Sequence, residues 1–70
     1  MLISLKAART NAEMSRPDVV KRLEIESGVK LSINTLASYE YRITQPDIII
    51  ASALASIYGL SVEDIAWDKQ

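Results

Sequence analysis

The chain has 70 residues, with eight lysines and arginines against nine aspartates and glutamates, and it contains no cysteine and no histidine. This length predicts a single small domain over residues 1–70. Without cysteine or histidine the chain cannot form disulfides, use a thiolate or an imidazole in catalysis, or build the usual zinc sites. Because small secreted domains usually need disulfides or a metal, the composition favours a cytoplasmic domain.

The charges are unevenly distributed along the chain. Residues 1–30 carry six basic and four acidic groups, whereas residues 31–70 carry two basic and five acidic groups. A net charge of −1 argues against a strongly electrostatic nucleic-acid binder. Because most of the basic groups lie in residues 1–30, any basic face must come mainly from the first half. The longest apolar run, residues 48–51, is far shorter than the roughly 20 residues of a membrane span. Lys6 and Arg9 interrupt the first apolar stretch, so residues 1–12 are not expected to be a signal peptide.

Two helices are predicted in the first half of the chain. Leu5, Ala8 and Ala12 have helical spacing and predict a helix over about residues 2–12. Ser15 is a typical N-cap, followed by proline in the first turn and by an acidic residue, and it predicts a helix over residues 16–27. Gly28 follows as the residue that ends this helix.

Three further helices are predicted in the second half. Ser32 is a plausible cap for a helix over residues 33–40, and a loop follows as far as Pro46. Asp47 caps a helix over residues 47–58, which Gly59 ends. Ser61 begins a short fifth helix over residues 62–66. With no clear strand, the expected fold is an all-α, compact five-helix bundle.

The fourth helix is apolar on nearly all sides. At about 100° per residue, one apolar stripe contains Ile48, Ala51, Ala55 and Tyr58, and we expect this stripe to face the core. Because a surface helix normally has one apolar stripe, the remaining apolar residues predict an exposed interaction patch. The patch is expected to consist of Ile49, Ile50, Ala53 and Ile57. The alternative is a few scattered apolar side chains on the surface.

The order of the helices and several short motifs resemble the Cro/C1-type (XRE-like) helix-turn-helix family, which has a lambda-repressor-like DNA-binding domain. The resemblance covers roughly Leu5 to Ile65. It rests on residues 5–9, Met14-Ser15, residues 31–40, Pro46, Leu54-Ala55 and residues 57–65. The stretch from Val20 to Glu40 is longer than usual, which is similar to the extended form in some temperate-phage repressors of Gram-positive hosts. Arg42 stands where many members have glycine.

The resemblance implies a DNA-reading role for the helix over residues 33–40. Base contacts are expected from Ile33, Asn34, Thr35 and Ser38, and the amide of Asn34 is suited to adenine. Phosphate contacts are expected from Ser15, Arg16, Lys30, Arg42, Thr44 and Gln45. The alternative for each of these residues is a solvated side chain or a helix cap. The family often pairs an arginine of the first helix with a glutamate that ends the reading helix, which implies a structural ion pair between Arg9 and Glu40.

Two functions follow from the resemblance. The first is a small transcriptional regulator of the phage lysis/lysogeny-switch kind, which binds double-stranded operator DNA in a bacterial cytoplasm and can pair with itself as a homodimer. The second is an antirepressor, or modulator of repression, which binds a partner repressor and masks its DNA-binding surface. The acidic balance, the absence of Lys and Arg from residues 33–40 and the extra apolar surface favour the second function, whereas the intact helix-turn-helix order favours the first. The two functions are compatible. No catalytic constellation is recognisable, so we expect no enzymatic activity, cofactor, metal site, small-molecule substrate or membrane partner.

Overall fold

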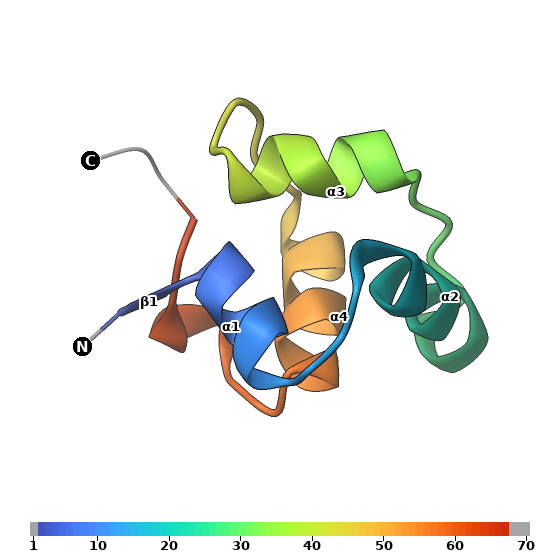
Figure 1. Ribbon diagram of the computed structural model, residues 1–70, viewed down its shortest axis with the longest axis horizontal. Helices are drawn as coiled ribbons and strands as arrows, with labels where there is room; N and C mark the ends of the chain where they lie inside the picture. Colours follow the sequence, from blue (N-terminus) through green and yellow to red (C-terminus); the bar gives the residue numbers. More distant parts are fainter. Residues whose placement is uncertain (1, 68–70) are drawn as a thin grey trace.

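Four α-helices and a short C-terminal segment pack around a shared core in the computed structural model, which describes residues 2–67 (Figure 1). The elements in chain order are β1 (Ile3–Ser4), α1 (Leu5–Asn11), α2 (Arg16–Ser27), α3 (Ile33–Glu40), α4 (Ile48–Ile57), the 3₁₀ helix η1 (Val62–Asp64) and β2 (Ile65–Ala66). The predicted bounds of α2 and α3 are confirmed, and α1 and α4 are shorter than predicted. The predicted mostly helical architecture is therefore confirmed.

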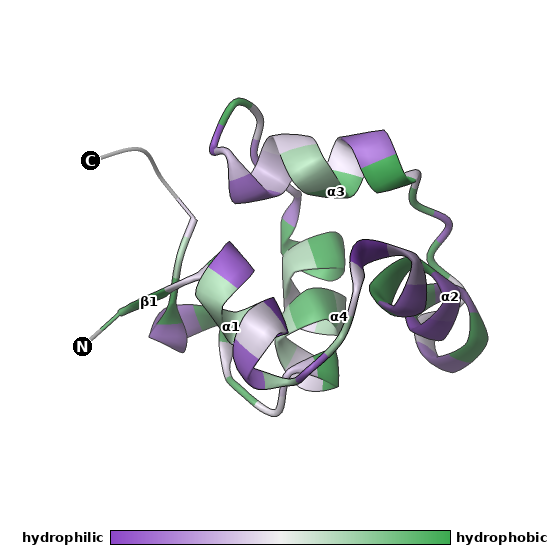
Figure 2. Cartoon of the chain, viewed as in Figure 1, coloured by the Kyte–Doolittle hydropathy of each residue, from purple (hydrophilic) through white to green (hydrophobic). Residues whose placement is uncertain are grey.

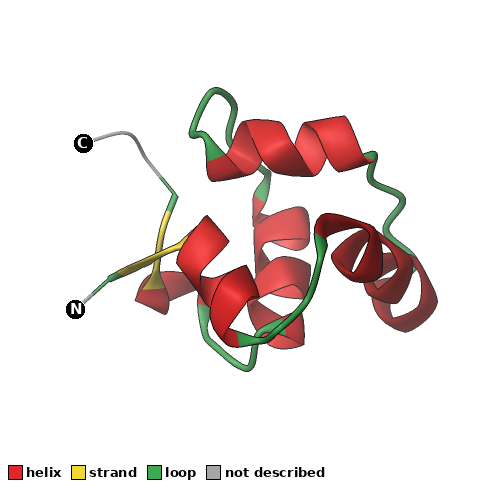
Figure 3. Ribbon diagram, in the orientation of Figure 1, coloured by secondary structure: helices red, strands yellow, loops and turns green. Residues whose placement is uncertain are grey.

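The prediction of an all-α fold is wrong at the two ends of the described chain. Ile3 pairs with Ile65, and Ser4 pairs with Ala66, in a short parallel ladder (Figure 3). Residues 2–4 are therefore not part of the first helix. This helix begins after Ser4, because the Ser4 hydroxyl caps it by accepting the N–H of Ala7 at 3.0 Å. The predicted fifth helix is reduced to η1, since the chain turns into β2 at Ile65.

The polar residues predicted as N-caps have this role. Ser15 accepts the N–H of Asp18 at 3.3 Å, and Ser32 accepts the N–H of Thr35 at 3.0 Å. Asp47 accepts the N–H of Ile50 at 2.9 Å. Each bond satisfies a backbone donor that the first helical turn leaves without a partner, which is why these helices begin where they do.

Each of the four α-helices is followed by a residue in the left-handed conformation, and two of these four residues are glycine. Gly28 and Gly59 have φ values of 68° and 72°, as expected for the residue after a helix. Glu13 and Arg42 have φ values of 58° and 61° at the corresponding positions after α1 and α3. The Ile43 N–H donates to the Ser38 carbonyl at 2.9 Å, which closes α3 around Arg42. Arg42 thus adopts a conformation that glycine accommodates with less strain.

The core lies where α2, α3 and α4 meet. Val19, Leu23, Leu36 and Leu54 are its fully buried large side chains among the described residues. Figure 2 shows that α4 is hydrophobic along most of its length, whereas α2 is largely hydrophilic. Because α4 lies at the centre, it is covered over a wider arc than a surface helix.

The predicted exposed face of α4 is partly wrong, because the neighbouring elements cover a wider arc of this helix than expected. Ile57, predicted in the exposed patch, is buried, and Ile48, predicted in the core, is 67% exposed. Ile50 and Ala53 are half-buried against the core, so Ile49 is the one predicted patch residue that is fully exposed. The buried side chains from Ala51 to Ile57 form one continuous arc of about 160° at about 100° per residue. The exposed face consists of Ile48, Ile49, Ser52 and Ser56.

Candidate nucleic-acid interface

The first turn of α3 is exposed, while its opposite face anchors the helix. Leu36 is fully buried and Tyr39 is 9% exposed, and both belong to the core cluster. Ile33 is 45% exposed, and Asn34 is also exposed. In Figure 1, α3 lies across the top of the molecule, with its first residues beside the connection from α2. The beginning of α3 is thus exposed to solvent.

The predicted base-contacting residues lie together on α3 but differ in availability. Ile33 and Asn34 are exposed, whereas Thr35 and Ser38 are half-buried. The Thr35 hydroxyl lies 2.8 Å from the Ser32 hydroxyl, so the two share a hydrogen bond at the helix N-terminus. Asn34 is therefore the exposed polar side chain of the group, and the Thr35 hydroxyl is engaged at the helix cap.

The N-terminus of α2 is less suited to phosphate than the sequence suggested. The Asp18 carboxylate accepts the Ser15 N–H at 3.1 Å, and the Ser15 hydroxyl caps the helix in return. These hydrogen bonds from the Ser15 backbone and side chain lower the pKa of Asp18. A charged carboxylate therefore already interacts with the helix N-terminus, and a phosphate there would meet a like charge. This geometry disfavours Ser15 as a phosphate contact.

Glu40 at the end of α3 is buried between two arginines. Arg9 Nε donates to Glu40 Oε2 at 2.6 Å, and the carboxylate side chain is 0% exposed. Arg9 also donates from Nη1 to the Met14 carbonyl at 3.0 Å. The expected ion pair between Arg9 and Glu40 is thus present, and it ties α1 to the end of α3.

Arg16 is the second partner of Glu40, which sequence reasoning missed. Its Nε and Nη2 lie 3.0 and 2.9 Å from Glu40 Oε1. The guanidinium also stacks over the Tyr41 ring, 5.5 Å from its centroid. The Arg16 side chain is 25% exposed and bound within the protein, so it is a weaker candidate for phosphate contact than predicted. Within the described residues, the two arginines and the one carboxylate of this cluster carry a net charge of +1.

The remaining predicted phosphate contacts flank α3 at its two ends. Lys30 lies in the connection from α2, and it is exposed. Arg42, Thr44 and Gln45 lie in the connection to α4, where Arg42 is half-buried and the other two are exposed. Neither Lys30 nor Arg42 forms a salt bridge with another residue in the range 2–67. Of the predicted phosphate contacts, Lys30 and Arg42 are therefore the two cations whose charge no acidic residue within 2–67 neutralises through a salt bridge.

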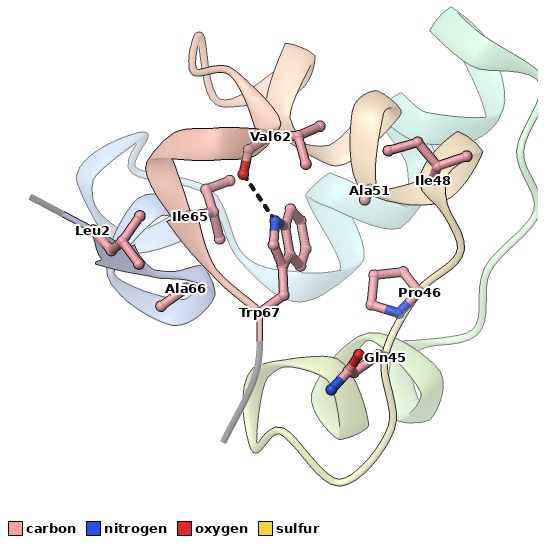
Figure 4. Close-up of a pocket in the computed structure, with 9 residues that line it drawn as sticks. All are labelled: Leu2, Gln45, Pro46, Ile48, Ala51, Val62, Ile65, Ala66 and Trp67. Atoms are coloured by element: carbon pink, nitrogen blue, oxygen red, sulfur yellow. Dashed lines mark hydrogen bonds between the residues drawn. The ribbon is translucent and has the colours of Figure 1, made fainter. Parts of the chain in front are cut away.

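A pocket lined mainly by apolar residues lies away from the first turn of α3, and little in the sequence indicated it. Its volume is about 330 Å³, and it is lined by Leu2, Gln45, Pro46, Ile48, Ala51, Val62, Ile65, Ala66 and Trp67. Figure 4 shows the Trp67 indole in the middle, with Pro46 and Ile48 on one side and Ile65 on the other. Trp67 Nε1 donates to the Val62 carbonyl at 3.0 Å, which fixes the ring. Trp67, an aromatic residue directly after the last predicted helix, was the one feature of the sequence that could have indicated this pocket.

The geometry thus provides two separate surfaces, the exposed first turn of α3 and the apolar pocket beside α4. Over residues 2–67, none of the helices combines the length and the apolar character needed to cross a membrane. No family model matches the chain, and no match was found among the curated proteins or the solved structures.

Proposed function

We propose that this protein is a small helix-turn-helix transcriptional regulator that acts in a bacterial cytoplasm and inserts the first turn of α3 into the major groove of operator DNA. The observation that carries the proposal is the outward exposure of Ile33 and Asn34 on a helix that is fixed from behind. The resemblance of the helix order and motifs to the Cro/C1-type family, including phage lysis/lysogeny-switch proteins, supports the same function.

The exposed side chains have a chemistry suited to A·T pairs. The Asn34 amide offers one donor and one acceptor in the pattern that adenine presents in the major groove. Ile33 is suited to the thymine methyl group, and Ser38 lies about one turn further along the helix. Since α3 has no arginine or lysine, the common arginine contact to guanine is absent. The proposal therefore predicts an A·T-rich half-site and a modest affinity.

The electrostatic contribution to binding follows from the two unpaired cations beside α3. If Lys30 and Arg42 each neutralise one phosphate, log K falls with log salt with a slope of about −2 per protomer. Arg16 contributes little to this slope because Glu40 retains it. This is a shallow dependence for a DNA-binding protein, and it agrees with the net charge of −1.

The test is selection of duplexes from a random pool at low salt, followed by titration of the enriched sequence. Asn34→Ala is expected to lose about 1–3 kcal/mol of discrimination at one base pair. Ser52→Ala, which removes an exposed polar group from α4, is the matched control and should bind like the wild type. Failure to enrich any sequence, or equal sequence preference in Asn34→Ala, would contradict the proposal.

The second candidate function is that of an antirepressor that masks the DNA-binding surface of a partner repressor. The observation that favours it is the exposed apolar pair on α4, where Ile48 and Ile49 are 67% and 69% exposed. The test is to add this protein to a complex between operator DNA and a repressor encoded beside its gene. Release of the DNA that is lost in Ile49→Glu but kept in Asn34→Ala would support this function. Unchanged repressor binding in the presence of excess protein would exclude it for that repressor.

A further inference from the structure

We propose that the pocket between the first turn of α4 and β2 binds one apolar side chain of a lysine- or arginine-rich amphipathic helix from a partner protein. The proposal deepens the second candidate function, on which it rests, by naming the surface and the chemistry of the partner. It does not involve the first turn of α3, which Figure 1 shows on the opposite side of the molecule from residues 65–67.

The lining of the pocket suits an apolar side chain. Its volume of about 330 Å³ is large enough to admit one. Eight of the nine lining residues are apolar, and the Nε1 of Trp67 is already bonded to the Val62 carbonyl. The wall also exposes polar atoms, but burial of a Leu or Ile side chain against the apolar residues gains the usual hydrophobic free energy.

The charges around the pocket indicate the sign of the partner. Asp47, Glu63 and Asp64 directly precede or follow lining residues, and all three are exposed. No lysine or arginine occupies such a neighbouring position within residues 2–67. Two of the carboxylates are held in place, since Asp47 accepts the Ile50 N–H and Asp64 accepts the Ser61 N–H and hydroxyl. Apolar lining residues with carboxylates, and no lysine or arginine, at the adjacent positions of the described chain are complementary to an apolar side chain flanked by cations.

The same charges argue against a second copy of this chain as the occupant. A two-fold dimer places the same patch of each protomer against the other. Each Asp47, Glu63 and Asp64 would then approach acidic groups of the same kind, and like charges across an interface cost several kcal/mol. A basic amphipathic helix avoids this repulsion, because its cations lie beside the apolar side chain that enters the pocket.

The test uses the intrinsic fluorescence of Trp67, because the sequence contains one tryptophan and it lines the pocket. The probe is a synthetic peptide of Leu and Lys with helical spacing, and the control is the same pattern of Leu and Glu. We expect a saturable shift of the emission maximum with the Leu–Lys peptide and none with the Leu–Glu peptide. Circular dichroism confirms that each protein variant remains helical.

Two double variants separate the pocket from general electrostatic attraction. Asp47→Asn with Glu63→Gln is expected to weaken peptide binding about fivefold or more, because asparagine keeps the cap while both charges are removed. Glu24→Gln with Glu26→Gln removes the same charge from exposed positions on α2 and should leave the binding unchanged.

Three results would overturn the proposal. They are equal responses to the two peptides, no response at about 1 mM peptide, and an emission shift on dilution of the protein alone, which would identify a second copy as the occupant. Because peptide binding does not report on the release of a repressor from DNA, failure of this proposal is distinguishable from failure of the second candidate function.

Discussion

Replacement of Glu40 by glutamine is the perturbation for which the structure makes the strongest prediction. Glutamine keeps the shape of the side chain but removes the charge that binds Arg9 and Arg16. Breaking a buried ion pair on one side costs about 3–5 kcal/mol. Since the two arginine side chains remain 14% and 25% exposed, water can partly solvate them. We therefore expect a loss at the lower end, about 3 kcal/mol.

This loss is large compared with the stability expected of the whole domain. A chain of 70 residues has an unfolding free energy of about 4–10 kcal/mol. In urea, with an m-value of about 1.5 kcal/mol/M, a loss of 3 kcal/mol lowers the midpoint by about 2 M. The assay is equilibrium denaturation followed by both circular dichroism and the fluorescence of Trp67. Agreement of the two probes establishes that unfolding is two-state.

Three further variants locate the origin of the effect. Arg9→Gln is expected to cost about 2 kcal/mol and Arg16→Gln less, because Arg9 is more buried and also binds the Met14 carbonyl. Glu24→Gln, at an exposed position on α2, should change stability by less than about 0.5 kcal/mol. A midpoint for Glu40→Gln within about 0.3 M of the wild type, at an unchanged m-value, would refute the structural importance assigned to Glu40.

Three other predictions concern single residues. Arg42→Gly should stabilise the protein by about 0.5–1 kcal/mol in urea denaturation, because relief of left-handed strain exceeds the added chain entropy, and a lower midpoint would contradict this. Tyr58→Phe should stabilise the protein by about 1 kcal/mol, because the buried Tyr58 hydroxyl has no hydrogen-bond partner among residues 2–67. Burial also raises the pKa of this hydroxyl. A clear loss of stability would count against this reasoning. The pKa of Asp18 is lowered by the hydrogen bonds from Ser15, so its stabilising contribution is present at neutral pH and is lost as the pH falls through its folded pKa. Asp18→Asn should therefore be less stable than the wild type at pH 7, with a difference that shrinks in acid, and an equal difference at pH 7 and pH 2 would disprove the assignment.

Local signals in the sequence were sufficient to predict the middle of the fold. Serine before Arg16 and before Ile33, and glycine after Ser27, have a direct physical effect on the first or last turn of a helix. Both bounds of α2 and the beginning of α3 follow from these effects. The left-handed residue Arg42 was not predicted, because nothing in its side chain favours that conformation.

The features that the sequence did not predict depend on contacts between distant parts of the chain. The pairing of Ile3 with Ile65 joins the two ends of the described chain, and such short strands have no periodicity of their own. Arg16 reaches Glu40 across 24 positions, so no local pattern links them. The sequence of α4 has two apolar stripes, and either of them could have faced the core. The serines at positions 52 and 56 were the local indication of the exposed face.

Some parts of the candidate site could be predicted from the sequence and others could not, because the latter depend on contacts between distant residues. The exposed first turn of α3 agrees with the expected position of base contacts, because it follows from the helix bounds and the buried Leu36. Ser15 and Arg16 are less available than expected, because Asp18 and Glu40 bind them. These competing partners could be recognised only once the helices were packed together.

Nuclear magnetic resonance can show whether α3 reads DNA through its first turn, as proposed. Amide shifts of the ¹⁵N-labelled protein are recorded while the selected duplex is added. We expect the largest changes at Ile33, Asn34, Thr35 and Ser38, with smaller changes at Lys30 and Arg42. Changes confined to residues around Trp67, or no changes at saturating duplex, would contradict it.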